Sequence, residues 1–284
     1  MANGILIVDK PQDWTSQDVV SKLRGVFHER RIGHGGTLDP MATGVLPVFI
    51  GRATRGVEFF EHADKVYCAQ LKLGVITDTQ DSSGNVLEEK PVQVSAEDMD
   101  KVLAQFRGEI SQIPPMYSAI KIGGKKLYEL ARAGKEVERK PRRITIFSLE
   151  AKALSDTEWE LLVHCSKGTY VRTLCHDIGQ ALGCGACMTA LRRVKAGEYD
   201  LAQSTPLEKI LACEDPEALL LPTDSLFASY PALTLSPAQE KCCRNGASLT
   251  FCGEGTYRVY GQDGSFLALS EVREGKLCTV KSFF

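Results

Sequence analysis

The sequence predicts an α+β fold in two parts, a large domain over residues 1–224 and a small β-rich domain over residues 225–284. Helical and strand patterns are mixed along the large part, whereas the small part holds short alternating segments and one helical pattern. The chain has 284 residues and is 43% hydrophobic. It is therefore long enough and apolar enough to bury one large core and one small one.

The first elements follow from the spacing of apolar residues. Residues 4–9 form an apolar run that ends at Lys10-Pro11, as a buried strand does. Thr15 or Ser16 caps a helix whose apolar residues recur at helical spacing up to Phe27. After it we expect, in order, a strand over 45–50, a helix over 52–62, a strand over 65–74, a turn over 81–85 and a helix with a capping box from Ser95.

The second half of the large domain begins with a predicted hairpin. Residues 142–154 and 158–165 alternate apolar and polar side chains and flank a short turn. A helix through Ile178 and Leu182 follows, and the acidic, proline-containing stretch 205–224 is typical of a domain junction. For the small domain the patterns predict a helix from Ser236 and strands over 256–260, 266–272 and 277–281.

Charge is unevenly distributed along the chain. The formal net charge is -2, which by itself disfavours a nucleic-acid partner. Residues 121–143, however, hold nine basic residues against three acidic ones, while residues 57–112 hold five against eleven. Affinity for a phosphate backbone depends on local cation density, so this basic strip predicts a nucleic-acid contact, with a solvated charged surface as the alternative.

A glycine-rich stretch carries the main chemical signal, in the run Gly33-His34-Gly35-Gly36-Thr37-Leu38-Asp39-Pro40. His34 and Asp39 are its only groups suited to acid, base or nucleophile chemistry. The proline disfavours a helical conformation at Asp39, which places the carboxylate on a turn or an extended segment. Local chemistry leaves two interpretations open: a presented catalytic acid, or an Asx-turn that closes a loop.

Together with Gly44-Val45-Leu46-Pro47, this run resembles the catalytic motif of the TruB-type tRNA pseudouridine synthases, in which the aspartate is essential. The resemblance implies that Asp39 is catalytic. It also implies a pseudouridine-synthase catalytic domain with a mixed, largely antiparallel sheet flanked by helices, followed by a PUA-like RNA-binding domain. Family members often carry a hydroxyl residue where this chain has Gly35, a position with no chemical role attached to it.

Two further motifs extend the resemblance. The family's Lys-x-Tyr strand matches Lys65-Val66-Tyr67 and implies that Tyr67 stacks on the target base, whereas side-chain chemistry alone favours a core aromatic. The family's Gly-Thr-Tyr-x-Arg motif matches residues 168–172. It implies that Arg172 lies beside Asp39 and keeps that carboxylate ionised, with Tyr170 as a wall of the pocket. A surface arginine and a core tyrosine are the alternatives.

Three more residues are candidate RNA contacts. His34 is expected to fill the space that the target base leaves in its loop. Leu191, in the family-like run Ala190-Leu191-Arg192-Arg193, is expected to pack on the base pocket, with ordinary core packing as the alternative. Lys10 lies between a strand and a proline, so its ammonium reaches either a phosphate or solvent.

Residues 112–143 are predicted to protrude as an RNA-gripping insertion. Paired prolines and paired glycines bound the segment, and its lysines are interspersed with apolar residues. A short helix can therefore dock its Leu and Tyr side and offer ammoniums to phosphates. In the TruB-type family that this sequence resembles, the corresponding insertion grips the RNA stem-loop. The candidate contacts are Lys121, Lys125, Lys126, Arg132 and Arg142.

No metal and no cofactor are expected. Cys184 and Cys187 form a Cys-x-x-Cys pair near Cys175 and His176, but the second pair of a zinc site is missing. Ten cysteines without regular spacing, no apolar run long enough to span a bilayer and no signal peptide predict a cytoplasmic protein with reduced thiols.

The resemblance implies an isomerase that flips a uridine out of tRNA, expected to be uridine 55 in the T loop, and converts it to pseudouridine with Asp39 acting on the sugar or on the uracil. We expect a monomer that binds the T stem-loop and requires neither a protein partner nor a membrane. Two alternatives stay open: a non-catalytic tRNA-binding or folding factor, and a synthase with a different RNA target or a guide-RNA assembly.

Overall fold

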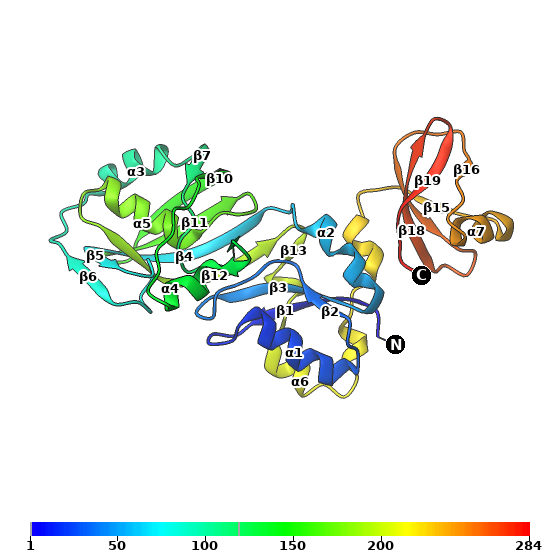
Figure 1. The fold of residues 1–284 in the computed structure, drawn as a ribbon, viewed down its shortest axis with the longest axis horizontal. Coiled ribbons are helices and arrows are strands. Elements are labelled where there is room, and N and C mark those ends of the chain that lie inside the picture. The colour runs from blue at the N-terminus through cyan, green and yellow to red at the C-terminus, as the bar shows by residue number, and fades with distance from the viewer. Residues whose placement is uncertain (1, 119) are drawn as a thin grey trace. The chain divides into compact units, whose positions relative to one another are not determined.

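The computed structural model describes residues 2–118 and 120–284 of the chain (Figure 1). The chain divides into two compact units, each built from segments that are separate in the sequence. Unit 1 comprises Met1–Asp39, Leu46–Glu61 and Ala202–Phe284, and unit 2 comprises Pro40–Val45 and His62–Leu201. The predicted boundary between residues 224 and 225 lies inside unit 1 and stays a prediction.

The N-terminal part of unit 1 contains short strand pairs and one long helix. β1 (Gly4–Lys10) pairs in parallel with β14 (Thr205–Pro206), and β2 (Ile32–His34) pairs antiparallel with the end of β3 (Thr43–Ile50). α1 (Ser16–Phe27) begins after Thr15, whose side chain accepts the Asp18 N–H in a capping box. The predicted strands over 4–9 and 45–50 and the predicted helix are thereby confirmed.

The predicted helix over 52–62 is only partly correct. A 3₁₀ helix, η1 (Gly51–Gly56), precedes a single turn of α-helix, α2 (Val57–Phe60). Gly51 has φ +64, and a Cβ there would lie 2.5 Å from the Ala2 carbonyl oxygen. Two glycines in six residues give the segment a low helix propensity, which explains the tight 3₁₀ turns. Later in the chain, η2 (Leu201–Gln203) crosses from unit 2 into unit 1. It is followed in unit 1 by α6 (Leu207–Leu211), η3 (Pro216–Leu219) and η4 (Thr223–Phe227).

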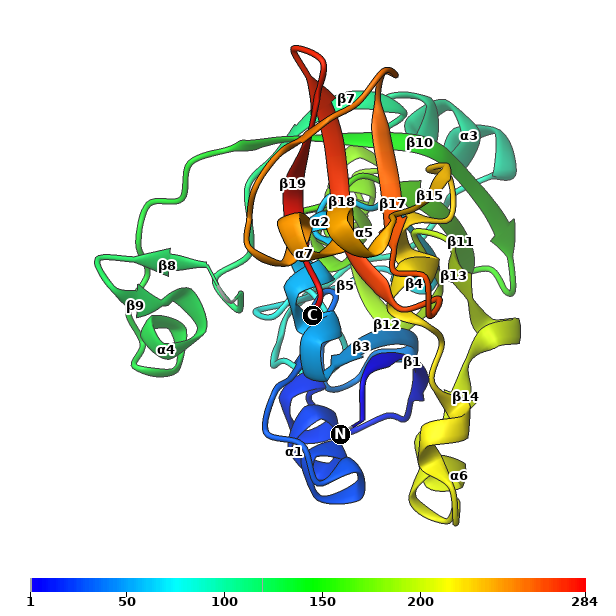
Figure 2. The same ribbon diagram turned by 90° about the vertical axis from the view of Figure 1, so that its right-hand side faces the viewer.

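The C-terminal part of unit 1 is β-rich, as predicted. Its five strands follow the order β15 (Ala232–Thr234), β17 (Thr256–Tyr260), β18 (Phe266–Arg273), β19 (Lys276–Ser282) and β16 (Leu249–Thr250). α7 (Pro237–Arg244) contacts strand β16 of this sheet (Figure 2). This part has a hydrophobic core of its own, formed by Leu235, Cys243, Val259, Leu267, Ala268 and Leu277.

Unit 2 is built on a sheet of long strands. From β12 (Ala186–Ala196) the order runs through β4 (Lys65–Leu73), β11 (Glu158–Cys165) and β10 (Arg142–Ala153) to β7 (Gly108–Gln112), with every neighbouring pair antiparallel. β13 (Tyr199–Asp200) also pairs with β12, and the start of β3 pairs with β12 in parallel, so the sheet is mixed. The predicted hairpin is confirmed as β10 and β11, whereas β7 and β12 were not predicted.

Two helices pack on this sheet. α5 (Val171–Ala181) contacts β12 and β4, and α3 (Ala96–Ala104) contacts β10 and α5 (Figure 1). α3 begins after Ser95, which forms the predicted capping box with Asp98. Along β4 every second residue is buried, from Lys65 to Leu73, as expected for a strand with one covered face. The α+β class and the mixed sheet flanked by helices are confirmed.

The predicted insertion forms a small structure between β7 and β10. It contains the hairpin β8 (Lys121–Ile122) and β9 (Lys125–Lys126), followed by α4 (Leu127–Arg132) (Figure 2). Leu127 is fully buried, so α4 docks an apolar side as predicted. Ala119, within the predicted insertion, lies outside the described residues. A second hairpin of unit 2, β5 (Val75–Thr77) and β6 (Val86–Glu89), carries the loop between Asp78 and Asn85.

Candidate active site

Asp39 lies in the irregular segment between β2 and β3, which the start of α1 holds in place. The hydroxyl of Ser16 accepts the backbone N–H of Leu38 at 2.8 Å and donates to the Leu38 carbonyl at 3.2 Å. Ser16 and Leu38 are buried, whereas Asp39 is half-buried. One hydroxyl therefore fixes the residue that precedes the carboxylate. The sequence indicated Ser16 only as a possible helix cap.

The glycines before Asp39 permit close packing. The Gly35 N–H donates to the Pro47 carbonyl at 2.8 Å, just beyond the pairing of β2 with β3. A Cβ at Gly35 would lie 2.5 Å from the Phe60 ring, so this chain has no room for the hydroxyl residue that family members often carry there. His34, the other candidate of this stretch, is half-buried at the end of β2.

Tyr67 lies on β4, in the interior of the unit 2 sheet. It is 9% exposed, and its register partners are Val163 on β11 and Arg193 on β12. Arg193 is 1% exposed, and its Nε donates to the Val45 carbonyl at 2.7 Å. A buried guanidinium opposite Tyr67 was not predicted, because the Leu-Arg-Arg triplet does not tell which arginine faces inward.

Lys65 adds a second cation on the same side of β4 as Tyr67, since alternate residues of a strand share a face. Burial, and to a lesser degree the charge of Arg193, lowers the pKa of Lys65 from 10.5 to about 8. Its Nζ contacts the Ala63 carbonyl oxygen. Because neutral pH lies below this value, Lys65 is protonated in most molecules, and this face of the strand is cationic.

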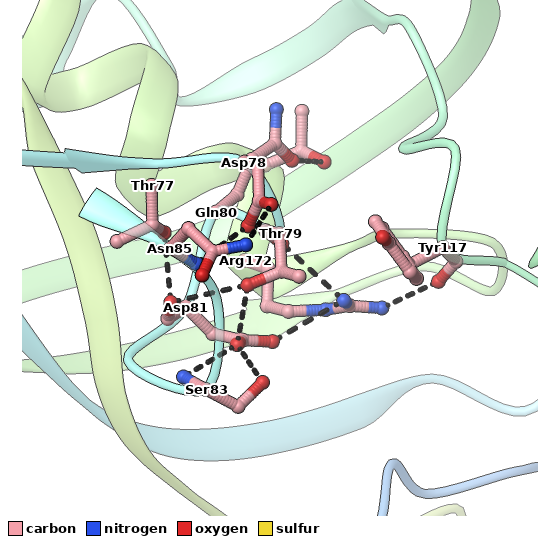
Figure 3. A network of polar contacts seen from close by, with 10 residues as sticks. Thr77, Asp78, Thr79, Gln80, Asp81, Ser83, Asn85, Tyr117 and Arg172 are labelled. Atoms are coloured by element: carbon pink, nitrogen blue, oxygen red, sulfur yellow. Dashed lines mark hydrogen bonds and ion pairs between the residues drawn. The ribbon is translucent and has the colours of Figure 1, made fainter. Parts of the chain in front are cut away.

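Arg172 is buried, 5% exposed, and forms an ion pair inside unit 2 (Figure 3). Its Nη1 donates to Asp81 Oδ2 at 3.2 Å, and its Nη2 donates to the Tyr117 carbonyl at 2.8 Å. The alternative of a surface arginine is therefore wrong. The observed carboxylate partner is Asp81, at the start of the predicted turn over 81–85, for which the sequence indicated no chemical role. The pairing of Arg172 with Asp39, which belongs to unit 1, stays a prediction.

The Asp81 carboxylate is oriented by its own loop (Figure 3). Its Oδ1 accepts the Ser83 N–H at 3.0 Å, the Ser83 hydroxyl and the Thr79 hydroxyl, the last at 2.8 Å. Thr77 donates to the Asp81 carbonyl at 2.7 Å. These bonds leave Oδ2 directed at Arg172. A buried ion pair needs such additional hydrogen bonds to offset its desolvation.

Tyr170 and Leu191 lie in unit 2, like Arg172. Tyr170 is half-buried at the N-cap of α5, and the side-chain amide of Gln112 holds its backbone. Leu191 is 8% exposed on β12, opposite Ala69 of β4. Unit 2 therefore brings Arg172, Tyr170, Asp81, Tyr117 and Gln112 together. The roles of Tyr170 and Leu191 at a base pocket stay predictions.

Lys10 requires a correction, because its ammonium is not at the surface. The residue is fully buried, and its Nζ donates to the carbonyl oxygens of Pro11 at 2.8 Å and of Trp14 at 2.6 Å. We expected an ammonium that reaches a phosphate or solvent. Instead it satisfies carbonyls of the turn between β1 and α1, as a buried charge must.

Most of the predicted cations of the insertion are exposed. Lys126 is the exception, since it is half-buried and donates to the Tyr128 hydroxyl at 3.1 Å. That hydrogen bond raises the pKa of Lys126. Lys126 and Arg132 lie 5.3 and 5.5 Å from the centroid of the Tyr128 ring, at cation–π distance. The exposed candidates are Lys121, Lys125, Arg132 and Arg142.

In the described part of the chain no group of three or more His, Cys, Asp or Glu side chains is placed to hold a metal ion. Cys184 and Cys187 are both buried, and burial raises the pKa of Cys187 and Cys175. Over residues 2–118 and 120–284, none of the helices has the length and apolar character needed to cross a membrane.

Comparison with protein families gives two adjoining matches. Residues 24–171 match the TruB family pseudouridylate synthase (N terminal domain), and residues 172–228 match the tRNA pseudouridylate synthase B C-terminal domain. The matched range contains Asp39, Tyr67 and Arg172 as well as the insertion. Together the two matches cover well over half of the chain.

Individual relatives match over almost the whole chain. The tRNA pseudouridine synthase B of Azoarcus sp. strain BH72 is 46% identical over 281 residues, covering 98% of this chain and 93% of its own. That of Clostridium kluyveri is 40% identical over 288 residues, covering 99% of both chains. That of Escherichia coli O1:K1 is 41% identical over 286 residues, covering 95% of this chain and 91% of its own.

Solved structures with a similar fold include a chain of a Cbf5-Nop10-Gar1 complex, with a TM-score of 0.74 at 24% identity, covering 100% of this chain and 85% of that one. A chain of an H/ACA RNP bound to a substrate RNA containing 2'-deoxyuridine gives a TM-score of 0.73 at 22% identity, covering 100% of this chain and 86% of that one. At these identities the likeness concerns the fold, and it agrees with the predicted α+β architecture.

Proposed function

Since the chain belongs to the TruB family of pseudouridylate synthases, we propose that the uridine it isomerises is uridine 55, in the T loop of tRNA. The protein is a tRNA pseudouridine synthase, an isomerase that converts uridine to pseudouridine. The observation that carries the finer proposal is the extent of the match, which includes the segment of Asp39, the strand of Tyr67 and the helix of Arg172.

The reaction defines what the site has to supply. The bond between the ribose C1′ and N1 of the uracil breaks, the base turns, and C1′ bonds to C5 while C5 loses its proton and N1 gains one. No group leaves the complex and no electrons are exchanged with a second molecule. We therefore expect no metal and no cofactor to be required.

We assign the reacting carboxylate to Asp39, acting as a nucleophile or base at the sugar or the uracil. The Ser16 hydroxyl supports this role, because it fixes the adjoining Leu38 on both sides of its backbone. Tyr67 is proposed to stack on the flipped base, with Tyr170 and Leu191 as further walls of the pocket. His34 is proposed to fill the space that the base leaves in the T loop.

Arg172 is proposed to keep the Asp39 carboxylate ionised. Asp81 and the Tyr117 carbonyl hold the guanidinium in one orientation before the substrate arrives. A cation that is already oriented stabilises developing negative charge without reorganisation during the reaction. The exposed cations of the insertion, Lys121, Lys125, Arg132 and Arg142, are proposed to contact the phosphates of the T stem-loop.

The test is to map pseudouridine in an unmodified tRNA transcript after treatment with the purified protein. We expect a single modified position, uridine 55, and no modification when that uridine is replaced by cytidine. A transcript of the T stem-loop alone should also be modified, without a guide RNA or a protein partner. Modification at another position with uridine 55 left intact contradicts the proposal.

A further inference from the structure

The side-chain amide of Gln112 holds the backbone of Tyr170 from both sides. The Tyr170 N–H donates to Gln112 Oε1 at 2.9 Å, and Gln112 Nε2 donates to the Tyr170 carbonyl at 3.1 Å. Gln112 is 2% exposed. The amide therefore pairs with residue 170 as a neighbouring strand would, in a buried place where both groups need partners.

This pairing acts at the start of the helix that carries Arg172. Tyr170 is the N-cap of α5, and its carbonyl already accepts the Leu174 N–H at 3.0 Å. The Gln112 Nε2 donates to the second lone pair of the Tyr170 carbonyl. Its Oε1 accepts the Tyr170 N–H, which precedes the helix and has no acceptor within it. The amide thus sets the direction in which α5 begins, two residues before the guanidinium.

A second bond joins the same two segments five residues further on. The Tyr117 carbonyl accepts Arg172 Nη2 at 2.8 Å, so the stretch from Gln112 to Tyr117 is bonded at both of its ends to residues 170–172. Between them, Pro114 and Pro115 restrict the backbone to a narrow range of φ. The prolines therefore limit how far the two ends of this stretch can move independently.

Gln112 also lies at the base of the insertion, where β7 ends and β10 begins. It is the last residue of β7, and its register partner on the returning strand β10 is Arg142. Arg139, just before that strand, donates from Nη1 to the Pro114 carbonyl at 3.2 Å. The outgoing and the returning chain of the insertion are thus both tied to the segment that holds Tyr170 and Arg172.

We propose that Gln112 is a positioning residue for pseudouridine formation. Its amide fixes the backbone at Tyr170. Through that backbone it positions the Tyr170 ring and the Arg172 guanidinium relative to the base of the insertion that binds tRNA, where β7 ends and β10 begins. This rests on the roles proposed above for Tyr170 and Arg172. Gln112 is buried and both polar atoms of its amide bond the Tyr170 backbone, so we expect it to act on the chemical step and not on affinity.

The test compares Gln112→Met, which keeps the side-chain length but removes both hydrogen bonds, with Gln112→Glu, which keeps the acceptor and removes the donor. Gln105→Met and Gln105→Glu are the matched controls, because Gln105 is exposed seven residues earlier in the same unit. The readouts are the single-turnover rate constant at saturating enzyme, the dissociation constant for tRNA and the thermal midpoint. At saturation the rate constant does not depend on the folded fraction, so it separates positioning from stability.

We expect both Gln112 variants to lower the rate constant by about tenfold to a hundredfold while the dissociation constant changes by less than about threefold, as expected for interactions that matter only in the chemical step. The Gln105 controls should match the wild type. Wild-type rate constants in both folded Gln112 variants overturn the inference, as does a loss confined to tRNA affinity.

A parallel measurement on Arg172→Gln, which removes the positive charge, separates this inference from the proposed function. If Arg172→Gln is slow and the Gln112 variants are not, only the inference about Gln112 is overturned. If Arg172→Gln keeps the wild-type rate constant, the role proposed for Arg172 fails, and the inference about Gln112 fails with it.

Discussion

Buried charges determine much of the chemistry of single residues in unit 2. Arg172 is 5% exposed and Asp81 is 3% exposed, and each is the other's ionic partner. Removing one member of such a pair costs stability, because the remaining buried charge loses attraction that offset its desolvation. Asp81 should therefore matter for stability as well as for the orientation of the guanidinium.

For Asp81→Asn we expect the free energy of unfolding to fall by about 3 kcal/mol, because the amide lacks the negative charge that helps to offset the desolvation of Arg172. The single-turnover rate constant should fall as well. Urea denaturation measures the first effect, and tritium release from tRNA labelled at C5 of uridine measures the second. Asp156→Asn is the control, since Asp156 is exposed on the turn between β10 and β11. Equal stability of the two variants contradicts the expectation.

Asp177, on α5, predicts a pH dependence of stability. Burial raises its pKa from 3.8 to about 6 in the folded state. Between these values the folded protein binds more protons than the unfolded one, so this residue makes stability fall as the pH rises, and the full cost is present above pH 6. Because Asp177 is partly exposed, we expect a cost of about 1 kcal/mol after allowance for solvent screening.

Asp177→Asn should therefore be more stable than the wild type above the folded-state pKa of about 6, with the difference vanishing as the pH approaches 3.8, the ordinary pKa of an aspartate. Urea denaturation at several pH values measures it. A difference that grows as the pH falls has the wrong sign and contradicts the assignment.

The candidate residues differ in how far the sequence could reveal them. Asp39, Tyr67 and Arg172 were predicted because family motifs surround them. Asp81 and Gln112 were missed, since their partners lie 91 and 58 residues away and only the folded chain brings them together. Lys10 was predicted wrongly although its partners are close in the sequence. The residue types around it do not indicate that the carbonyls of Pro11 and Trp14 surround its ammonium.

Among the secondary-structure elements, those with strong local signals were predicted correctly. The capping boxes of α1 and α3 and the alternation along β10 and β11 fixed their type and approximate ends. β12 was missed, although it is the longest partner of β4. Two register shifts, near Met188 and near Arg193, interrupt its alternation, and buried positions occur on both faces.

The insertion is the element that should govern binding of tRNA. Reversing its exposed charges in Lys121→Glu, Lys125→Glu and Arg132→Glu combined should weaken tRNA affinity by tenfold or more and reduce the slope of log affinity against log salt by up to about 0.9 per lost duplex phosphate contact. The dissociation constant over a series of salt concentrations measures both effects.

Lys152→Glu is the control for this triple variant, because Lys152 is exposed on β10 outside the insertion. An unchanged salt slope in the triple variant means that the insertion does not contact phosphates.

On the scale of the whole molecule, the proposed catalytic residues come from both compact units. Asp39 belongs to unit 1, whereas Tyr67 and Arg172 belong to unit 2. The chain as a whole is slightly acidic, and the strip 121–143 supplies concentrated positive charge for an RNA partner. The division into units was not foreseen, because residues 202–284 join the N-terminal segments and no local pattern reports contacts between such distant segments.

The central claim is that the Asp39 carboxylate performs the chemistry on tRNA that the rest of the chain binds. Single-turnover tritium release from C5-labelled tRNA with Asp39→Asn tests it most directly, with the exposed Asp100→Asn on α3 as the control. We predict a rate constant lowered by at least about a thousandfold, a tRNA dissociation constant within about threefold of the wild type, and an unaffected control. Appreciable tritium release by the Asp39→Asn enzyme contradicts the claim.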